Sequence, residues 1–104
     1  MKYFNLTKNE ILQRIGYFRQ RKGISAYELG MILGHSKTYF YRIQNGSITL
    51  SVDMLLEILE VLEVSTYEFF YPDLASFEKD QQQLKFVKSL TADEFDAITK
   101  LIKR

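Results

Sequence analysis

The stretch from Lys37 to Asn45 is predicted to be a short helix whose two sides differ in chemistry. At about 100° per residue, Phe40 and Ile43 fall on one side of it, with Tyr39 at the edge of that side. The opposite side carries Lys37, Thr38, Tyr41 and Arg42. Arg can bond guanine O6 and N7 together, Lys can bond guanine or phosphate, and Thr can contact a thymine methyl group. This side therefore predicts contacts with DNA base edges, with a merely solvated helix face as the alternative.

Start and stop signals divide the chain into the helices that must position this surface. Four capping boxes predict helix starts: Thr7 with Glu10, Ser25 with Glu28, Ser65 with Glu68, and Thr91 with Glu94. Ser36 and Ser51 are further candidate N-caps. Gly23, Gly34, Gly46 and Pro72 predict helix ends. The predicted helices are 8–22, 26–33, 37–45, 52–62, 66–71, 75–89 and 92–103, so the fold class is all-α.

Apolar stripes on these helices predict one core. Its expected members are Ile11, Ile15, Phe18, Leu29, Leu33, Phe40, Ile43, Val52, Leu55, Leu59, Leu62, Val64 and Phe69. The connection Gly34-His35-Ser36 suits two short helices that cross at a wide angle. Gly30 is expected where these helices approach closely. Gly16 also lies inside a helix, and close helix contact is the only reason that the sequence suggests for it.

The net charge of +1 hides an uneven distribution. Residues 1–50 hold eight Lys and Arg against two acidic residues, whereas residues 51–104 hold six against eleven. Such an asymmetry points to nucleic acid or another acidic surface as a partner of the basic half. Chance segregation of the charges is the alternative.

Several function classes are not expected. The chain has no Cys and one His, so disulfides, thiolate metal sites and His-based metal clusters are excluded. Glu57, Glu60 and Glu63 are predicted on an exposed helix face, and His35 is predicted to be a surface or packing residue rather than a catalytic base. We expect no enzyme activity, no cofactor and no small-molecule ligand. Neither a signal peptide nor an apolar run of about 18 residues occurs, so no membrane contact and a cytoplasmic location are expected.

Residues 15–70 resemble the phage-repressor type of helix-turn-helix domain, the lambda repressor, Cro and xenobiotic-response-element (XRE) group. The resemblance rests on Arg19 to Ser25, Glu28-Leu29, Leu33 to Gly46 and Leu55 to Ser65. It implies a five-helix bundle, here followed by two C-terminal helices, with the third helix in the major groove. It places base recognition on Lys37, Thr38, Tyr41 and Arg42. It places phosphate contacts near Ser25, Tyr39, Asn45 and Gly46; Ser36 and Arg19 are further predicted phosphate contacts.

The chain departs from the family pattern on the second predicted helix. Ala26 stands where many members carry Gln, and Met31 and Ile32 replace polar residues. Ser47-Ile48-Thr49 follows Asn-Gly where Lys or Arg is more common, which predicts fewer phosphate contacts and less salt-sensitive binding. Together with Ala26 and Tyr41, the residues Tyr27, Met31 and Ile32 predict an alternative function. That alternative is a protein-interaction module such as an antitoxin or an anti-regulator.

Two domains are expected. Residues 8–72 would be the DNA-binding domain, and residues 73–104 a C-terminal helical extension and candidate dimerisation element. The predicted function is a sequence-specific double-stranded DNA-binding transcriptional regulator, with repression the expected outcome. The resemblance implies a homodimer, because regulators of this kind often append a dimerisation element. A two-fold dimer would place two recognition helices about 34 Å apart on a pseudo-palindrome.

Overall fold

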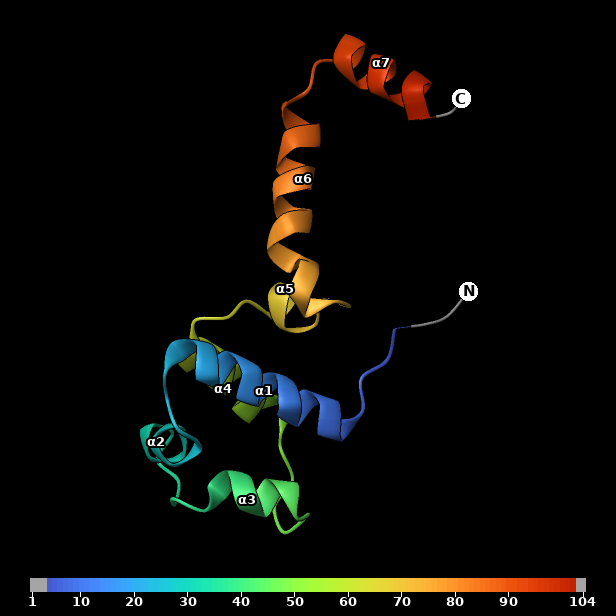
Figure 1. Ribbon diagram of the computed structural model, residues 1–104. Helices are drawn as coiled ribbons and strands as arrows, with labels where there is room; N and C mark the ends of the chain where they lie inside the picture. The colour runs from blue at the N-terminus through green and yellow to red at the C-terminus, as the bar shows by residue number, and fades with distance from the viewer. Residues whose placement is uncertain (1–3, 103–104) are drawn as a thin grey trace. The chain divides into compact units, whose positions relative to one another are not determined.

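The computed structural model describes residues 4–102, and every regular element within that range is helical, which confirms the all-α prediction. The chain divides into two compact units between Pro72 and Asp73. The first unit contains α1 (Lys8–Lys22), α2 (Ala26–Ile32), α3 (Tyr39–Gln44), α4 (Val52–Leu62) and α5 (Thr66–Phe69). In this unit α1 packs against α2 and α4, α2 packs against α3, and α4 packs against α5 (Figure 1).

Three of the four predicted capping boxes form, each at the start of a helix. The Thr7 hydroxyl accepts from the Glu10 N–H, and the Glu10 carboxylate accepts from the Thr7 N–H. The same reciprocal bonds join Ser25 to Glu28 and Thr91 to Glu94. The backbone hydrogen bond from Thr7 is the main reason that the pKa of the Glu10 carboxyl lies below its ordinary value.

The remaining capping box, predicted for Ser65 and Glu68, forms only in part. Ser65 Oγ accepts from the Glu68 N–H at 3.0 Å, but the Glu68 carboxylate pairs with Arg21 Nη1 at 2.8 Å. The carboxylate thus ties α5 to α1 instead of closing its own helix start. α5 also ends at Phe69 rather than at residue 71.

The third helix is shorter than predicted. It begins at Tyr39, and its N-cap residue is Thr38, whose side chain makes no capping hydrogen bond. The prediction of Ser36 as N-cap was therefore wrong. The Ser36 carbonyl instead accepts from the Tyr39 N–H at 3.1 Å, which closes a tight turn just before the helix.

The core of the first unit is apolar. Nine predicted core residues are buried: Ile15, Phe18, Leu29, Ile43, Leu55, Leu59, Leu62, Val64 and Phe69. Three more, Ile11, Leu33 and Phe40, are only half-buried.

Val52 was wrongly predicted in the core, since it is 73% exposed in the first turn of α4. Ile58 takes its place with 0% exposure, because Leu55, Ile58, Leu59 and Leu62 follow the i, i+3, i+4, i+7 spacing of one helix face.

Arg14 fastens the end of the first unit to α1. Its Nη1 donates to the carbonyl oxygen of Phe69 at 2.7 Å and to that of Tyr71. Its Nη2 donates to the carbonyl oxygen of Pro72 at 3.1 Å. Since the last carbonyls of a helix lack partners within it, one guanidinium here satisfies three acceptors at and beyond the end of α5.

The second unit buries no residue within its described part. It contains a 3₁₀ turn, η1 (Leu74–Ser76), followed by α6 (Phe77–Ser89) and α7 (Ala92–Ile102). The helix predicted over 75–89 thus starts as a separate turn, and the predicted end at residue 103 lies outside the described residues. Large apolar side chains are exposed on both helices: Leu84, Phe86, Val87, Phe95, Ile98, Leu101 and Ile102.

Replacing each of two glycines inside helices with alanine is expected to change the free energy of unfolding in opposite directions. A Cβ at Gly30 would lie 2.9 Å from the backbone oxygen of Ser36, which confirms the close approach predicted there, whereas a Cβ at Gly16 would meet nothing within 4 Å. Because Ala is favoured over Gly in a helix by about 1 kcal/mol, Gly16→Ala should raise the free energy of unfolding by that amount. Gly30→Ala should lower it by about 1–2 kcal/mol, because backbone must move. Urea unfolding followed by circular dichroism measures both, and changes of the same sign would contradict this account.

Glu63 ends α4 in the left-handed conformation, with φ of 57°. Such a conformation costs a residue other than Gly about 1–2 kcal/mol. Its carboxylate lies 3.1 Å from Lys22 Nζ, but the Glu63 side chain is 77% exposed, so the pair contributes little. Glycine relieves this strain but loses more conformational entropy on folding, which offsets part of the gain. Glu63→Gly should therefore raise the free energy of unfolding by about 0.5 kcal/mol. Glu63→Ala keeps the strain, so an equal gain from Ala in urea unfolding would contradict the explanation.

Candidate nucleic-acid interface

The turn between α2 and α3 fixes how α3 is presented. The His35 N–H donates to the Gly30 carbonyl at 2.9 Å, and Gly34 has φ of 78°. The His35 ring stacks on the Tyr39 ring with 3.9 Å between centroids and 11° between planes. With Gly30 against Ser36, these contacts hold the first turn of α3 to the end of α2.

The four predicted base-reading residues are all exposed. Tyr41, which is 67% exposed, and Arg42 belong to α3, while Lys37 and Thr38 lie in the turn before it. No acidic residue occurs in the sequence between Glu28 and Asp53. The surface that carries the turn and α3 therefore combines two cations and two hydroxyl groups without a carboxylate from this stretch.

The segment after α3 is ordered by Asn45. Its Oδ1 accepts from the Ser47 N–H at 2.9 Å and from the Ser47 hydroxyl at 2.6 Å. Gly46 has φ of 86°, and the Ile48 N–H donates to the Arg42 carbonyl at 3.1 Å. The amide group of Asn45 thus keeps its N–H donors, since only its oxygen is used in these two bonds.

Tyr39 lies deeper than its prediction as a residue at the edge of the helix face. It is 4% exposed and packs between His35 and Phe40, so it belongs to the core. Burial, followed by the nearby charge of Glu57, raises the pKa of its phenol above the ordinary value. Tyr39 is therefore a neutral packing residue near pH 7, and a phosphate contact through it has little exposed surface to use.

The other predicted phosphate residues have local partners. Ser25 Oγ accepts from the Glu28 N–H at 3.0 Å, which leaves its hydroxyl proton to donate elsewhere. Ser36 Oγ lies 3.2 Å from Thr38 Oγ1. Arg19 Nη1 donates to the Ile24 carbonyl at 2.9 Å and braces the connection between α1 and α2.

The cations of α1 are mostly committed to the fold. Arg14 holds the end of the unit, Arg21 pairs with Glu68 and lies 4.6 Å over the Phe18 ring, and Lys22 pairs with Glu63. Much of the basic excess in residues 1–50 is thus partnered internally. By contrast, Lys37 and Arg42 form no ion pair within residues 4–102.

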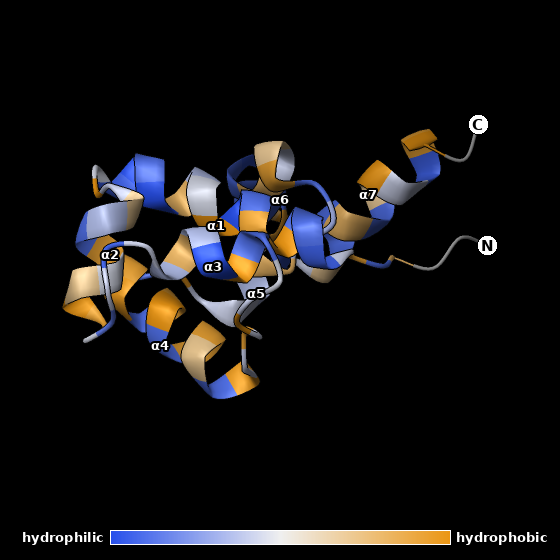
Figure 2. Ribbon diagram, turned by 90° about the horizontal axis from the view of Figure 1, so that it is seen from below, coloured by the Kyte–Doolittle hydropathy of each residue, from blue (hydrophilic) through white to orange (hydrophobic). Residues whose placement is uncertain are grey.

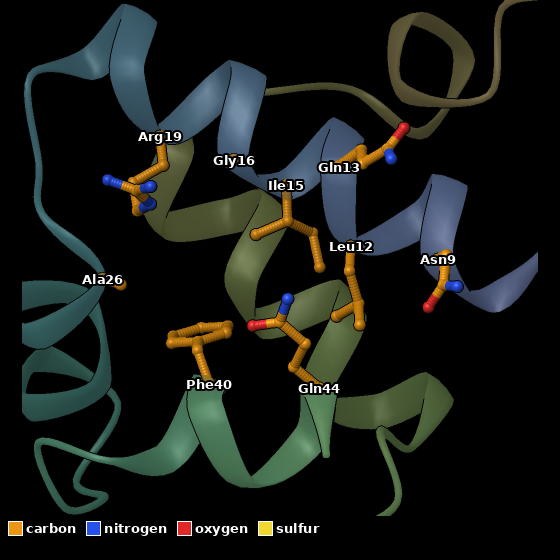
Figure 3. A pocket seen from close by; sticks show the side chains of 9 residues that line it. All are labelled: Asn9, Leu12, Gln13, Ile15, Gly16, Arg19, Ala26, Phe40 and Gln44. Atoms are coloured by element: carbon orange, nitrogen blue, oxygen red, sulfur yellow. The ribbon is translucent and has the colours of Figure 1, made fainter. Parts of the chain in front are cut away.

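A pocket of about 440 Å³ lies between α1, α2 and α3 and was not predicted. Figure 3 shows Leu12 and Ile15 from α1 opposite Phe40 and Gln44 from α3, with Arg19 at one edge. Two further amides from α1, Asn9 and Gln13, line it. Their i, i+4 spacing is the sequence signal that places both on one helix face, but without the path of α3 it does not reveal a pocket.

The described residues contain neither a metal-binding cluster nor a membrane-spanning helix. Within residues 4–102, no three His, Asp or Glu side chains lie close enough together to hold a metal ion. His35 is engaged by its ring stack on Tyr39. No helix in the same range is long and apolar enough to cross a membrane.

A family model described as helix-turn-helix matches residues 15–69. This match runs from the middle of α1 to the end of α5 and includes the whole of α2, the turn and α3. No curated protein and no solved structure gives a significant match to the chain.

Proposed function

Since the chain belongs to the helix-turn-helix family of the XRE and lambda-repressor type, we propose that it recognises a specific double-stranded DNA sequence with α3 in the major groove. The observation that carries this proposal is the exposed, carboxylate-free surface of Lys37, Thr38, Tyr41 and Arg42. Such a surface meets phosphate and base edges without electrostatic repulsion.

Within this proposal, Arg42 and Lys37 recognise guanine or nearby phosphate, and Thr38 and Tyr41 contact neighbouring bases. Arg42 is the strongest candidate for base recognition, because its guanidinium has a planar set of donors and no internal ion pair within residues 4–102.

Phosphate contacts are proposed at the two ends of the helix pair. Ser25 retains a donor at the start of α2, and the side chain of Asn45 presents its amide N–H groups after α3. Gly46 follows Asn45 in the same segment, although its own N–H donates to the Ile43 carbonyl. Ser36 and Arg19 are weaker candidates, since each already has a partner. Few cations are available, so the slope of log affinity against log salt should be shallow.

We also propose a homodimer formed through residues 73–104. The described part of this second unit buries no residue and exposes seven large apolar side chains on α6 and α7. A second copy would cover these faces and pair two first units on a pseudo-palindrome. Repression is the proposed outcome, because a bound dimer occludes the duplex that it covers.

Selection from a pool of randomised duplexes tests the whole proposal. We expect an enriched motif with two inverted half-sites, and sedimentation equilibrium of the free protein should give twice the chain mass. Enrichment of a single half-site would contradict the dimer. No enriched motif at low salt would contradict sequence-specific binding.

One observation favours a second candidate function, a protein-interaction module. Tyr27, Met31 and Ile32 on α2 are each more than half exposed. A shallow hollow of about 340 Å³ between α2 and α4 has three apolar lining residues, Ile32, Leu33 and Val61, and two acidic ones, Glu57 and Glu60. Figure 2 shows hydrophobic bands on the ribbons of both helices. Under this candidate, Met31→Lys would abolish co-purification of a stoichiometric protein partner and Arg42→Ala would not; the reverse pattern favours DNA binding.

A further inference from the structure

Gly16 has no packing role that explains a glycine in the middle of α1. Glycine is disfavoured in helix interiors relative to alanine. The sequence suggests close helix contact as the reason, but a Cβ built at Gly16 meets no atom within 4 Å, so that expectation was wrong. Gly16 instead lines the pocket between α1, α2 and α3. A side chain at this position would extend into the open space of that pocket.

The pocket has the composition of a small-molecule site. Its volume of about 440 Å³ lies in the range of ligand pockets, roughly 300–1,000 Å³. Leu12, Ile15 and the Phe40 ring supply apolar walls, and Gln44 supplies an amide among them (Figure 3). Ligand sites commonly combine apolar walls with a few polar groups that fix orientation.

The charge of the lining residues indicates that the pocket would take an anionic ligand. Arg19 is the one charged residue among the nine that line the pocket, and none of the nine is acidic. Arg19 Nη1 donates to the Ile24 carbonyl, which fixes the guanidinium while other donors remain for a ligand. A carboxylate matches the planar guanidinium, and a flat apolar ring matches the Phe40 wall.

Although the sequence led us to expect no small-molecule ligand, we propose that this pocket binds a small aromatic carboxylate, with its carboxylate at Arg19 and its ring between α1 and Phe40. The helix α3 contributes Phe40 and Gln44 to the pocket and Tyr41 and Arg42 to the exposed surface, so a bound ligand would lie against the helix that is proposed to read DNA. Occupancy therefore changes the affinity for the DNA site. This second step rests on the proposed function, whereas binding in the pocket does not.

The direct test uses the whole chain and two matched probes, indole-3-carboxylate and its neutral analogue indole-3-carboxamide. Amide ¹H–¹⁵N spectra are recorded during titration. We expect saturable shifts at residues of α1 and α3 with the carboxylate, and binding at least tenfold weaker with the carboxamide. No saturable shift with the carboxylate up to 10 mM, or equal binding of the two probes, would overturn the proposal.

Two variants test the location. Gly16→Leu fills the pocket and should weaken carboxylate binding at least tenfold. Gln20→Leu is the control, because it adds the same side chain to an exposed position of α1 outside the pocket. Circular dichroism and the dispersion of the amide spectrum check that each variant is folded. If Gly16→Leu does not fold, Gly16→Ser replaces it with a smaller expected loss. Unchanged binding by a folded pocket variant would overturn the location.

A final measurement separates the site from the proposed function. With the selected duplex, saturating indole-3-carboxylate should change the Kd at least threefold for the natural chain and leave that of Gly16→Leu unchanged. An unchanged Kd for the natural chain would overturn the regulatory step. A chain that binds the probe but selects no duplex would contradict the proposed function and leave the ligand site standing.

Discussion

Replacing Arg14 with methionine is expected to lower the free energy of unfolding of the first unit by about 3 kcal/mol, because hydrogen bonds from a charged donor contribute about 1.5–3 kcal/mol each and are not additive. The guanidinium serves the carbonyls of Phe69, Tyr71 and Pro72, two of them in partly buried bonds. Methionine keeps much of the side-chain length but leaves those acceptors without this donor. Urea unfolding followed by circular dichroism measures the change, with one m-value used for all variants.

The matched control is Lys22→Met, which removes another cation of the same helix. Its ion pair with Glu63 is exposed, so a loss below about 1 kcal/mol is expected. Equal losses in the two variants would show that general charge loss, rather than the carbonyl contacts, explains the effect. Arg14→Lys should recover only part of the stability, since an ammonium cannot reproduce the planar fork that spans these acceptors.

Arg14 also illustrates what the sequence hides. Local signals were sufficient for most helix boundaries, because caps and left-handed glycines act within four residues of their partners. Arg14 bonds to residues 55 to 58 positions away in the chain. From the sequence alone it is one of several cations of a basic half, and only the packing of α5 against the core brings the carbonyls to it.

The same contrast holds for the start of α5. Ser65 and Glu68 have the spacing of a capping box, and the hydroxyl bond forms as that spacing predicts. The carboxylate turns to Arg21 because α1 lies within reach, a tertiary contact that no local pattern contains. At α3, likewise, Ser36 has the residue type of an N-cap, but a tight turn that ends on Tyr39 delays the helix.

For the candidate site, the sequence predicted exposure better than it predicted burial. Tyr41 and Arg42 are exposed as the helical period requires, and Lys37 and Thr38 are exposed as predicted although they lie in the turn before α3. Tyr39 was placed only at the edge of the side that carries Phe40 and Ile43, yet it is buried, and its ring stacks on His35 from the preceding turn. The pocket beside α3 was missed because its walls come from three helices whose separation the sequence does not encode.

Replacing Arg42 with alanine is expected to weaken binding of the selected duplex by about 5- to 150-fold, which corresponds to about 1–3 kcal/mol for one bidentate base contact. Arg42 lies exposed on α3, and no ion pair within residues 4–102 involves it, so little of the loss should come from stability. Fluorescence anisotropy with the selected duplex and with a scrambled duplex, each at two salt concentrations, measures the change. The selected duplex should lose far more affinity than the scrambled one.

Lys79→Ala is the control for charge alone, because it removes an exposed cation of α6 and changes none of the seven apolar side chains on which the proposed dimer rests. It should change the affinity for both duplexes by a factor of about two or less, as expected for a cation that neutralises no phosphate. If Arg42→Ala weakened the two duplexes equally, Arg42 would be a phosphate contact, and base recognition would have to lie with Lys37, Thr38 or Tyr41. If neither duplex lost affinity, the exposed face of α3 would not be the DNA-binding surface, and the apolar surface of α2 would become the stronger candidate for function.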